Sequence, residues 1–144
     1  MSLVTTPEER FEDVPDFEYP YERVPVTEDG AEMAYVDVEP TGENADETFL
    51  LMHGEPSWSF LYRKMIPTLA ERGRVIVPDM LGLGRSDKYT DTDAYSFDLH
   101  YDSFETLLFE ELDLDEITLV CQDWGGILGL ALAGHNPERF ARLV

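Results

Sequence analysis

The sequence predicts an α/β fold built on a mainly parallel sheet. Two strand-like segments near the N-terminus, residues 21–26 and 31–39, are separated by the turn Glu28-Asp29-Gly30 and suit an antiparallel pair. Beyond them, short apolar runs alternate with segments whose apolar residues recur at helical spacing, which is typical of successive strand–helix units. Such units place parallel strands in one sheet and helices on its faces.

Each later element is predicted from its own pattern. The expected strands are short apolar runs that end near glycine or proline, and the expected helices carry apolar residues three and four positions apart. The order after a loop at 41–46 is a strand over 48–52, a helix over 58–72 kinked at Pro67, a strand over 74–77, a helix over 96–112, a strand over 117–121, a helix over 125–134 and a strand that begins at residue 140.

The chain is expected to form one modest domain with an extension. Its 144 residues and its hydrophobic fraction of 43% suit a single globular core. Residues 1–20 are acidic and contain three prolines, so we expect a surface arm with little regular structure. Residues 21–144 are expected to form an incomplete core domain, because the sequence stops within a predicted inner strand.

The charge balance restricts the expected partners. The 31 acidic residues outnumber the 10 basic ones and leave a net charge of −21, which disfavours binding to nucleic acid or to an anionic membrane. Roughly molar salt would screen this self-repulsion, since the Debye length is then about 3 Å. A halophilic, salt-adapted protein is therefore expected, with an ordinary acidic protein as the alternative.

A cytoplasmic location is expected from three features. The N-terminus lacks the basic flank and the apolar core of a signal peptide, and no run of 18 apolar residues indicates a membrane span. The one cysteine, Cys121, excludes an internal disulfide and suits a reducing compartment. We expect Cys121 to be a small packing residue.

Residues 117–126 combine a buried strand, a tight turn and a glycine pair that opens a helix. This is the arrangement of a nucleophile elbow, in which a sharp turn presents one reactive side chain. The reactive position holds Asp123 rather than serine, and a carboxylate there attacks carbon directly and forms an ester with the protein. Cys121 and Gly125, two residues to each side, are small enough for the crowded turn. The alternative is that Asp123 only caps the helix.

A second chemical segment, His-Gly-Glu-Pro-Ser-Trp at residues 53–58, follows the strand predicted over 48–52. A loop at this place supplies one backbone N–H group for an oxyanion, and the residue after the nucleophile supplies the other. We therefore expect the N–H groups of Glu55 and Trp124 to face Asp123 and to stabilise charge during ester hydrolysis. The alternative is that residues 53–58 form a plain turn.

Three segments together resemble haloalkane dehalogenases of the α/β-hydrolase superfamily. Residues 53–67 resemble the oxyanion loop of these enzymes, residues 78–88 the loop after their next core strand, and residues 120–126 their elbow. The segments keep the family's order, and the likeness runs from about residue 21 to residue 144. The resemblance implies the N-terminal half of an α/β-hydrolase fold, with a mostly parallel sheet, flanking helices, and the cap and the C-terminal part absent.

The resemblance also implies a mechanism. Asp123 would displace the halide from a haloalkane, and water would then cleave the alkyl ester to release an alcohol. Trp124 would bind the departing halide through its indole N–H, which suits an apolar side chain with one fixed donor. Glu55 resembles the branch of the family that holds halide between two tryptophans. No cofactor and no metal are expected, and the pair Gly82 and Gly84 lacks the third glycine of a dinucleotide-binding loop.

Ester hydrolysis needs a histidine base and an acid, which the family carries after the elbow. The three histidines here are poor substitutes: His53 belongs to the oxyanion loop, His100 is expected on a helix remote from the elbow, and His135 is expected at a helix C-terminus. We therefore expect this chain alone to be inactive, with a missing C-terminal half as a partner. Alternatives are an epoxide hydrolase, a haloacetate dehalogenase or a non-catalytic truncated fragment.

Overall fold

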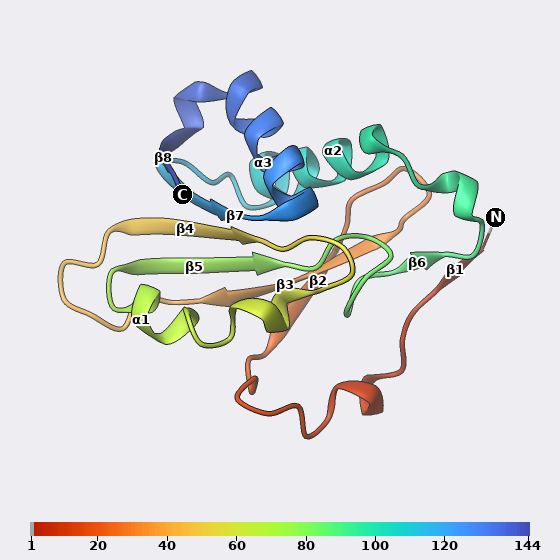
Figure 1. The fold of residues 1–144 in the computed structure, drawn as a ribbon, viewed down its shortest axis with the longest axis horizontal. Coiled ribbons are helices and arrows are strands. Elements are labelled where there is room, and N and C mark those ends of the chain that lie inside the picture. Colours follow the sequence, from red (N-terminus) through yellow and green to blue (C-terminus); the bar gives the residue numbers. More distant parts are fainter. Residues whose placement is uncertain (1) are drawn as a thin grey trace.

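A six-stranded mixed sheet forms the centre of the protein in the computed structural model, which describes residues 2–144 (Figure 1). The strand order is β2-β3-β5-β4-β7-β8. These strands are β2 (Tyr21–Pro25), β3 (Glu32–Val38), β4 (Glu47–Met52), β5 (Gly73–Pro78), β7 (Ile117–Cys121) and β8 (Phe140–Leu143). A separate antiparallel pair joins β1 (Leu3–Val4) to β6 (Lys88–Tyr89).

The pairing confirms the predicted α/β class. Strands β2, β3 and β5 pair antiparallel, whereas β5, β4, β7 and β8 run parallel. Figure 1 shows the arrows of β4 and β5 pointing to the same edge, so the loops that follow them lie together there. Met52 and Cys121, the last residues of β4 and β7, are register partners. The two predicted chemical segments therefore begin side by side.

The helix predicted over 58–72 is wrong in its extent. The segment instead forms a 3₁₀ turn at Ser59–Tyr62 and the short helix α1 at Ile66–Ala70. Pro67 does not kink a longer helix, because it lies in the first turn of α1. Proline is favoured there, since the first turn does not use its missing N–H group.

The other two helices lie close to their predicted positions. Helix α2 (Phe97–Glu105) begins after Ser96, whose Oγ accepts a hydrogen bond from the N–H of Leu99 at 3.0 Å, and it continues as a π-helical stretch over Thr106–Glu111. Helix α3 (Asp123–His135) begins two residues earlier than predicted, at Asp123 itself. With 13 residues α3 is too short to cross a bilayer, and the same holds for every other helix within residues 2–144. Short 3₁₀ turns also occur at Glu8–Phe11, Thr92–Ala94 and Pro137–Arg139.

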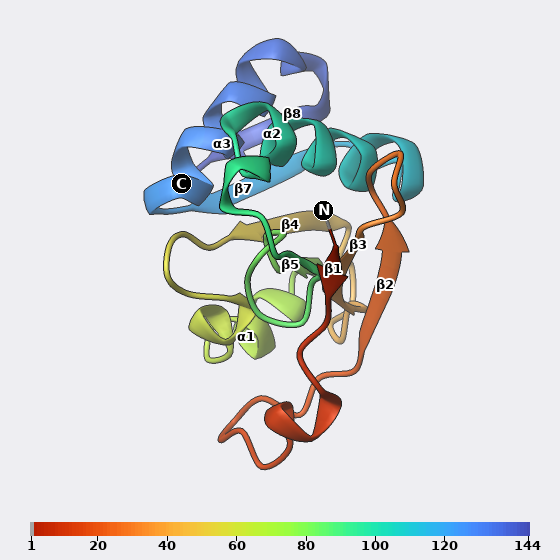
Figure 2. The same cartoon turned by 90° about the vertical axis from the view of Figure 1, so that its right-hand side faces the viewer.

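Strand alternation divides the core into two layers. Phe49 and Leu51 of β4 pack with the cluster around α1, whereas Leu50 and Met52 belong to the cluster that includes α2 and α3. Figure 2 shows α1 on one side of the sheet and α2 and α3 on the other. Because both faces are covered, the last four residues of β4 (49–52) form a continuous buried apolar run rather than an alternating one.

The N-terminal arm packs against the face that carries α1. Phe17 is 3% exposed and joins the core cluster of that face. The buried guanidinium of Arg85 lies 4.9 Å from the ring centroid of Phe17 and 4.4 Å from that of Tyr21. Phe11 and Trp58 complete this aromatic cage. Cation–π contacts are strengthened by desolvation, so the arm is held by both apolar burial and charge.

Exposed apolar side chains gather where α3 meets β8. Ile127 and Leu130 of α3 and Leu143 of β8 are each more than half exposed. A groove of about 510 Å³ runs between the two elements and is lined by Leu130 and Leu143 among others. We call these three residues the α3–β8 patch, and a patch of this kind is typical of a surface that another element covers.

Replacing Phe17 with alanine should destabilise the protein strongly. The substitution removes a buried ring from the core and one wall of the cage around Arg85, so the free energy of unfolding should fall by about 3 kcal/mol. Urea unfolding followed by circular dichroism measures this change. Glu18→Ala, at the exposed neighbouring position, is the matched control and should leave stability nearly unchanged. Equal unfolding curves for the two variants would show that the arm does not contribute to the core.

Candidate active site

Asp123 lies at the turn between β7 and α3 with a backbone conformation that few residues adopt. Its φ is +55°, in the left-handed region, which costs roughly 1 kcal/mol for a non-glycine residue. Strained conformations of this kind concentrate at functional sites, where the surrounding structure enforces them. The side chain is exposed, and it sits at the N-terminus of a 13-residue helix, whose dipole favours a carboxylate.

Two glycines allow the turns after β4 and β7 to touch. A Cβ atom on Gly54 would lie 2.5 Å from Oδ2 of Asp123, and one on Gly125 would meet the carbonyl oxygens of Met52 and His53. Any side chain at either position would therefore push the two turns apart. The predicted requirement for a small residue at 125 has this close approach as its physical cause.

One of the two expected backbone donors reaches the carboxylate. The N–H group of Glu55 donates a hydrogen bond to Oδ2 of Asp123 at 3.0 Å. The N–H group of Trp124 makes no such bond in the part of the chain that the structure describes, and neither does any other group to Oδ1 of Asp123. The arrangement holds one carboxylate oxygen and leaves the other free.

Trp124, the residue after Asp123, lines a cavity whose lining does not include Asp123 itself. The cavity has a volume of about 220 Å³, and Trp124 is 43% exposed. Glu55 lines the same cavity, so both residues that flank the carboxylate contribute to it. The remaining lining residues are Met80, Tyr95, Ser96, Phe97 and His100. The lining is mostly apolar and aromatic with a few polar groups, as is usual for small-molecule sites.

His53 fixes the loop that carries Glu55. The N–H group of Met80 donates to Nε2 of His53 at 3.0 Å, so Nε2 holds the lone pair and Nδ1–H donates to the carbonyl of Gly54 at 3.0 Å. Burial lowers the pKa of His53 and favours this neutral form. Both ring nitrogens are thus engaged, and His53 positions the loop rather than acting as a base.

Two further side chains brace the same loop. Oδ1 of Asp79 accepts a hydrogen bond from the N–H of Ser59 at 2.7 Å, and Oδ2 accepts one from the N–H of Arg85 at 3.0 Å. The hydroxyl of Tyr62 donates to the carbonyl of Met52 at 2.9 Å, and burial raises the pKa of Tyr62 to about 12. The sequence placed Asp79 only within the loop 78–88. Its contacts with Ser59 and Arg85 depend on the fold and could not be predicted from the local sequence.

The expectation that His100 lies remote from the elbow is wrong. His100 lines the same cavity as Trp124, because the first turn of α2 reaches the edge of the sheet where β4 and β7 end. His135 lies where expected, at the end of α3, and its Nδ1 is 2.8 Å from the hydroxyl of Tyr101. Throughout residues 2–144, no histidine forms a hydrogen bond with Asp123.

The residues around Asp123 give little support to a metal site or to a cysteine nucleophile. In the described range 2–144, no three His, Cys, Asp or Glu side chains converge as metal ligands would. Cys121 is half-buried, its Sγ lies 3.9 Å from the carbonyl oxygen of Val144, and burial raises the pKa of the thiol. A thiol with a raised pKa is a weaker nucleophile at neutral pH because less thiolate is present.

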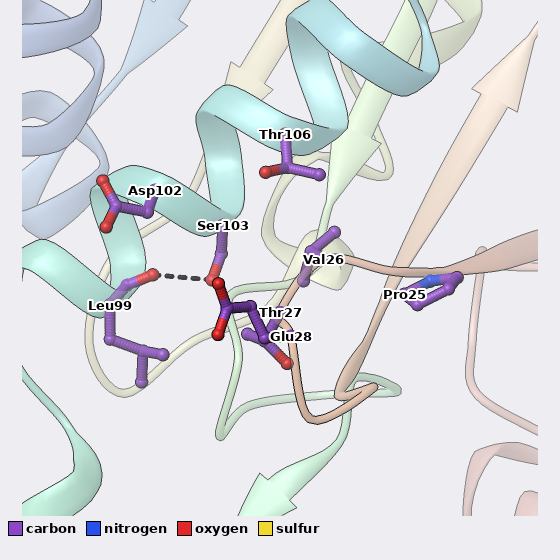
Figure 3. Close-up of a pocket in the computed structure, with 8 residues that line it drawn as sticks. All are labelled: Pro25, Val26, Thr27, Glu28, Leu99, Asp102, Ser103 and Thr106. Atoms are coloured by element: carbon purple, nitrogen blue, oxygen red, sulfur yellow. Dashed lines mark hydrogen bonds between the residues drawn. The ribbon is translucent and has the colours of Figure 1, made fainter.

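A larger cavity lies elsewhere, between the β2–β3 turn and α2 (Figure 3). Its volume is about 550 Å³, and its polar groups include the carboxylates of Glu28 and Asp102. The hydroxyl of Ser103 is occupied by a 2.6 Å bond to the carbonyl of Leu99, drawn as a dashed line in Figure 3. This cavity has no paired nucleophile and base, so its size does not make it the better candidate.

Known proteins share this arrangement of elements. Residues 47–144 match the sequence profile of the α/β hydrolase fold family. A haloalkane dehalogenase of Psychrobacter cryohalolentis is 46% identical over 99% of this chain and 47% of its own length. The tetrameric haloalkane dehalogenase DpaA from Paraglaciecola agarilytica NO2 superposes with a TM-score of 0.90 at 45% identity, over 99% of this chain and 48% of that one.

A relative with a different reaction is also similar. The cis-3-alkyl-4-alkyloxetan-2-one decarboxylase of Shewanella oneidensis is 39% identical over 87% of this chain and 38% of its own length. The chain spans about half the length of the curated relatives it matches. The predicted resemblance to haloalkane dehalogenases and the predicted half-fold are both confirmed. The chain belongs to the α/β hydrolase fold family, and haloalkane dehalogenases are among its relatives.

Proposed function

We propose that this chain carries the nucleophile of a haloalkane dehalogenase. The observation that supports the proposal most directly is the position of Asp123. It is strained at the elbow, the N–H group of Glu55 holds one of its oxygens, and both Glu55 and the following residue, Trp124, line the cavity. Oδ1 attacks the carbon that bears the halogen, a C–O bond forms, and the halide leaves with the electron pair of the C–X bond. The indole N–H of Trp124 donates to that halide in a cavity lined mostly by apolar and aromatic side chains, where a hydrogen bond is stronger than in water.

Ester hydrolysis completes the proposed cycle. Water adds to the ester carbonyl, the N–H groups of Glu55 and Trp124 stabilise the oxyanion, and the C–O bond of the carboxyl carbon breaks to release the alcohol. The water needs a base. His53 and His135 are engaged elsewhere, and His100, which lines the cavity, makes no hydrogen bond with Asp123 among the described residues. We propose that a further polypeptide segment supplies the base and its acid and covers the α3–β8 patch. The coverage of only about half of the relatives' length supports this.

The cavity favours dehalogenation over epoxide opening. An epoxide oxygen must be protonated as the ring opens, which requires a free acid donor such as a tyrosine hydroxyl. Tyr95 is the tyrosine that lines this cavity, and its hydroxyl accepts from the N–H of Tyr89 at 2.8 Å and donates to the carbonyl of Tyr89 at 3.3 Å. It is therefore committed to the backbone, whereas the N–H of Trp124 suits a halide.

We also propose that the protein is adapted to the salt-rich cytoplasm of a halophile. Within residues 2–144, five ion pairs engage only five of the 31 carboxylates, namely Glu32, Asp37, Glu47, Asp87 and Asp113. The net charge of −21 is thus largely unpaired at the surface, where salt screens it effectively.

Incubation of the chain with 1-bromobutane should add one butyl group to Asp123 and then stop. Ester formation needs only groups that this chain contains, whereas ester hydrolysis needs a base. Intact mass measurement followed by peptide mapping detects the modification, and Asp123→Asn should remain unmodified. Modification by 1,2-epoxybutane but not by the bromide would instead favour an epoxide hydrolase. Sustained halide release by the 144-residue chain would contradict the proposed external base.

Trp124→Phe should slow the alkylation of Asp123 about 10- to 100-fold. The substitution keeps an aromatic ring but removes the hydrogen bond to a departing anion, and a bond to a charged group contributes roughly 1.5–3 kcal/mol. The rate of mass increase with 1-bromobutane measures the effect. Trp58→Phe is the matched control, because Trp58 belongs to the cage around Arg85 and does not line the cavity. An equal loss of alkylation rate in both variants would contradict the role of Trp124 as the halide donor.

Potassium chloride should stabilise the folded chain up to molar concentration. Screening at roughly 1 M salt shortens the Debye length to about 3 Å and weakens the repulsion among unpaired carboxylates. Thermal unfolding followed by circular dichroism at low and high salt measures the shift in Tm. Sucrose at equal osmolality controls for solvent exclusion, which also stabilises compact states. Salt adaptation would be refuted if the Tm did not change with salt, or if sucrose raised the Tm as much as potassium chloride does.

A further inference from the structure

His100 is held in the cavity wall by an aromatic neighbour. Its ring stacks on Tyr95, with ring centroids 5.9 Å apart and planes 25° apart. Tyr95 is itself fixed, because its hydroxyl is bonded to the backbone of Tyr89 on both sides of the oxygen. The imidazole therefore has a defined orientation beside the cavity that Trp124 also lines.

The two ring nitrogens of His100 have different surroundings. Nδ1 is buried and has no hydrogen-bond partner among the described residues. Nε2 also forms no hydrogen bond with any atom of residues 2–144, but unlike Nδ1 it is not buried and is accessible to a ligand. A buried N–H group without a partner is rarer in proteins than an unpaired acceptor. The proton is thus assigned to Nε2, and burial lowers the pKa of His100, which favours the neutral ring.

We propose that His100 is a specificity-determining residue that donates Nε2–H to an acceptor atom on the substrate. The proposal rests on the dehalogenase function proposed above and names its substrate class more closely: haloalkanes that carry an ether, hydroxyl or carbonyl oxygen a few bonds from the halogen. Met80, Phe97 and Tyr95 surround this donor with apolar surface. A plain alkyl chain would strip water from Nε2–H without replacing the hydrogen bond, whereas an oxygen-bearing chain replaces it.

The test compares two ligands of nearly equal shape, 1-bromobutane and 1-bromo-2-methoxyethane. Binding is measured in the full chain carrying Asp123→Asn, which cannot form the ester, by titration monitored through the fluorescence of Trp124. The ratio of the two dissociation constants cancels most differences in cavity shape. In His100→Phe, which keeps a flat ring against Tyr95, this ratio should shift about 3- to 10-fold in favour of the bromoalkane, as expected for one lost neutral hydrogen bond.

His135→Phe is the matched control, because it makes the same substitution at a histidine that does not line the cavity, and it should leave the ratio unchanged. The donor role of His100 is overturned if His100→Phe leaves the ratio of dissociation constants unchanged, or if neither bromide binds. Alkylation of unsubstituted protein separates the two proposals. If His100→Phe shifts the ratio of dissociation constants as expected but the unsubstituted protein is not alkylated, the dehalogenase function is overturned and the donor role of His100 stands. If the protein is alkylated but His100→Phe leaves the ratio unchanged, only the role of His100 is overturned.

Nitrogen NMR of the unsubstituted chain gives a reading that does not depend on folding of the variant. The His100 signals should show the neutral tautomer protonated at Nε2, and the Nε2 resonance should move on addition of 1-bromo-2-methoxyethane and less on addition of 1-bromobutane. A proton on Nδ1, or a doubly protonated ring at neutral pH, would overturn the proposal.

Discussion

The contact between the turn after β4 and the turn after β7 is the constraint on which the rest of the site depends. Gly54 and Gly125 are the two positions where this contact leaves no room for a side chain. The approach brings Glu55 N–H to 3.0 Å from Asp123, and it holds Asp123 in a left-handed conformation that isolated chains avoid. The carboxylate of Asp123 projects from this edge because the close approach of the two turns fixes the backbone around it.

The contact exists because β4 and β7 are neighbours in the sheet. Their last residues, Met52 and Cys121, are register partners, so the loops that follow emerge together although Glu55 and Asp123 are 68 positions apart in sequence. Ligand sites at the carboxyl ends of parallel strands are a general consequence of this topology. The loop after β5 then braces the site from the other side, through the bond between Met80 and His53.

Two of the ten basic residues hold loops in place beneath the acidic surface. Arg85 is buried in its aromatic cage, and Nζ of Lys88 donates to the carbonyls of Gly84 and Ser86 at 2.7 and 2.8 Å. Burial lowers the pKa of both side chains. These cations hold the glycine-rich loop and the N-terminal arm in place, while most carboxylates remain unpaired in solvent.

The sequence by itself determined the fold class and the order of the main strands along the chain, and it singled out the two segments, with Glu55 on one and Asp123 and Trp124 on the other, that the structure brings together. Those features are local: apolar periodicity, turn residues and a strand–turn–helix motif are all read within about fifteen positions. Helix extents were less predictable, and the segment 58–72 broke into two pieces because proline favours a helix start over a helix interior.

Only the tertiary structure decided which distant groups share a cavity. It brought His100 to the wall beside Trp124, engaged both nitrogens of His53 and left Trp124 N–H without a bond to Asp123. The packing of α2 against the sheet and the register of β4 with β7 set these relations. Both result from burial of apolar faces across the whole core, so no window of sequence contains them.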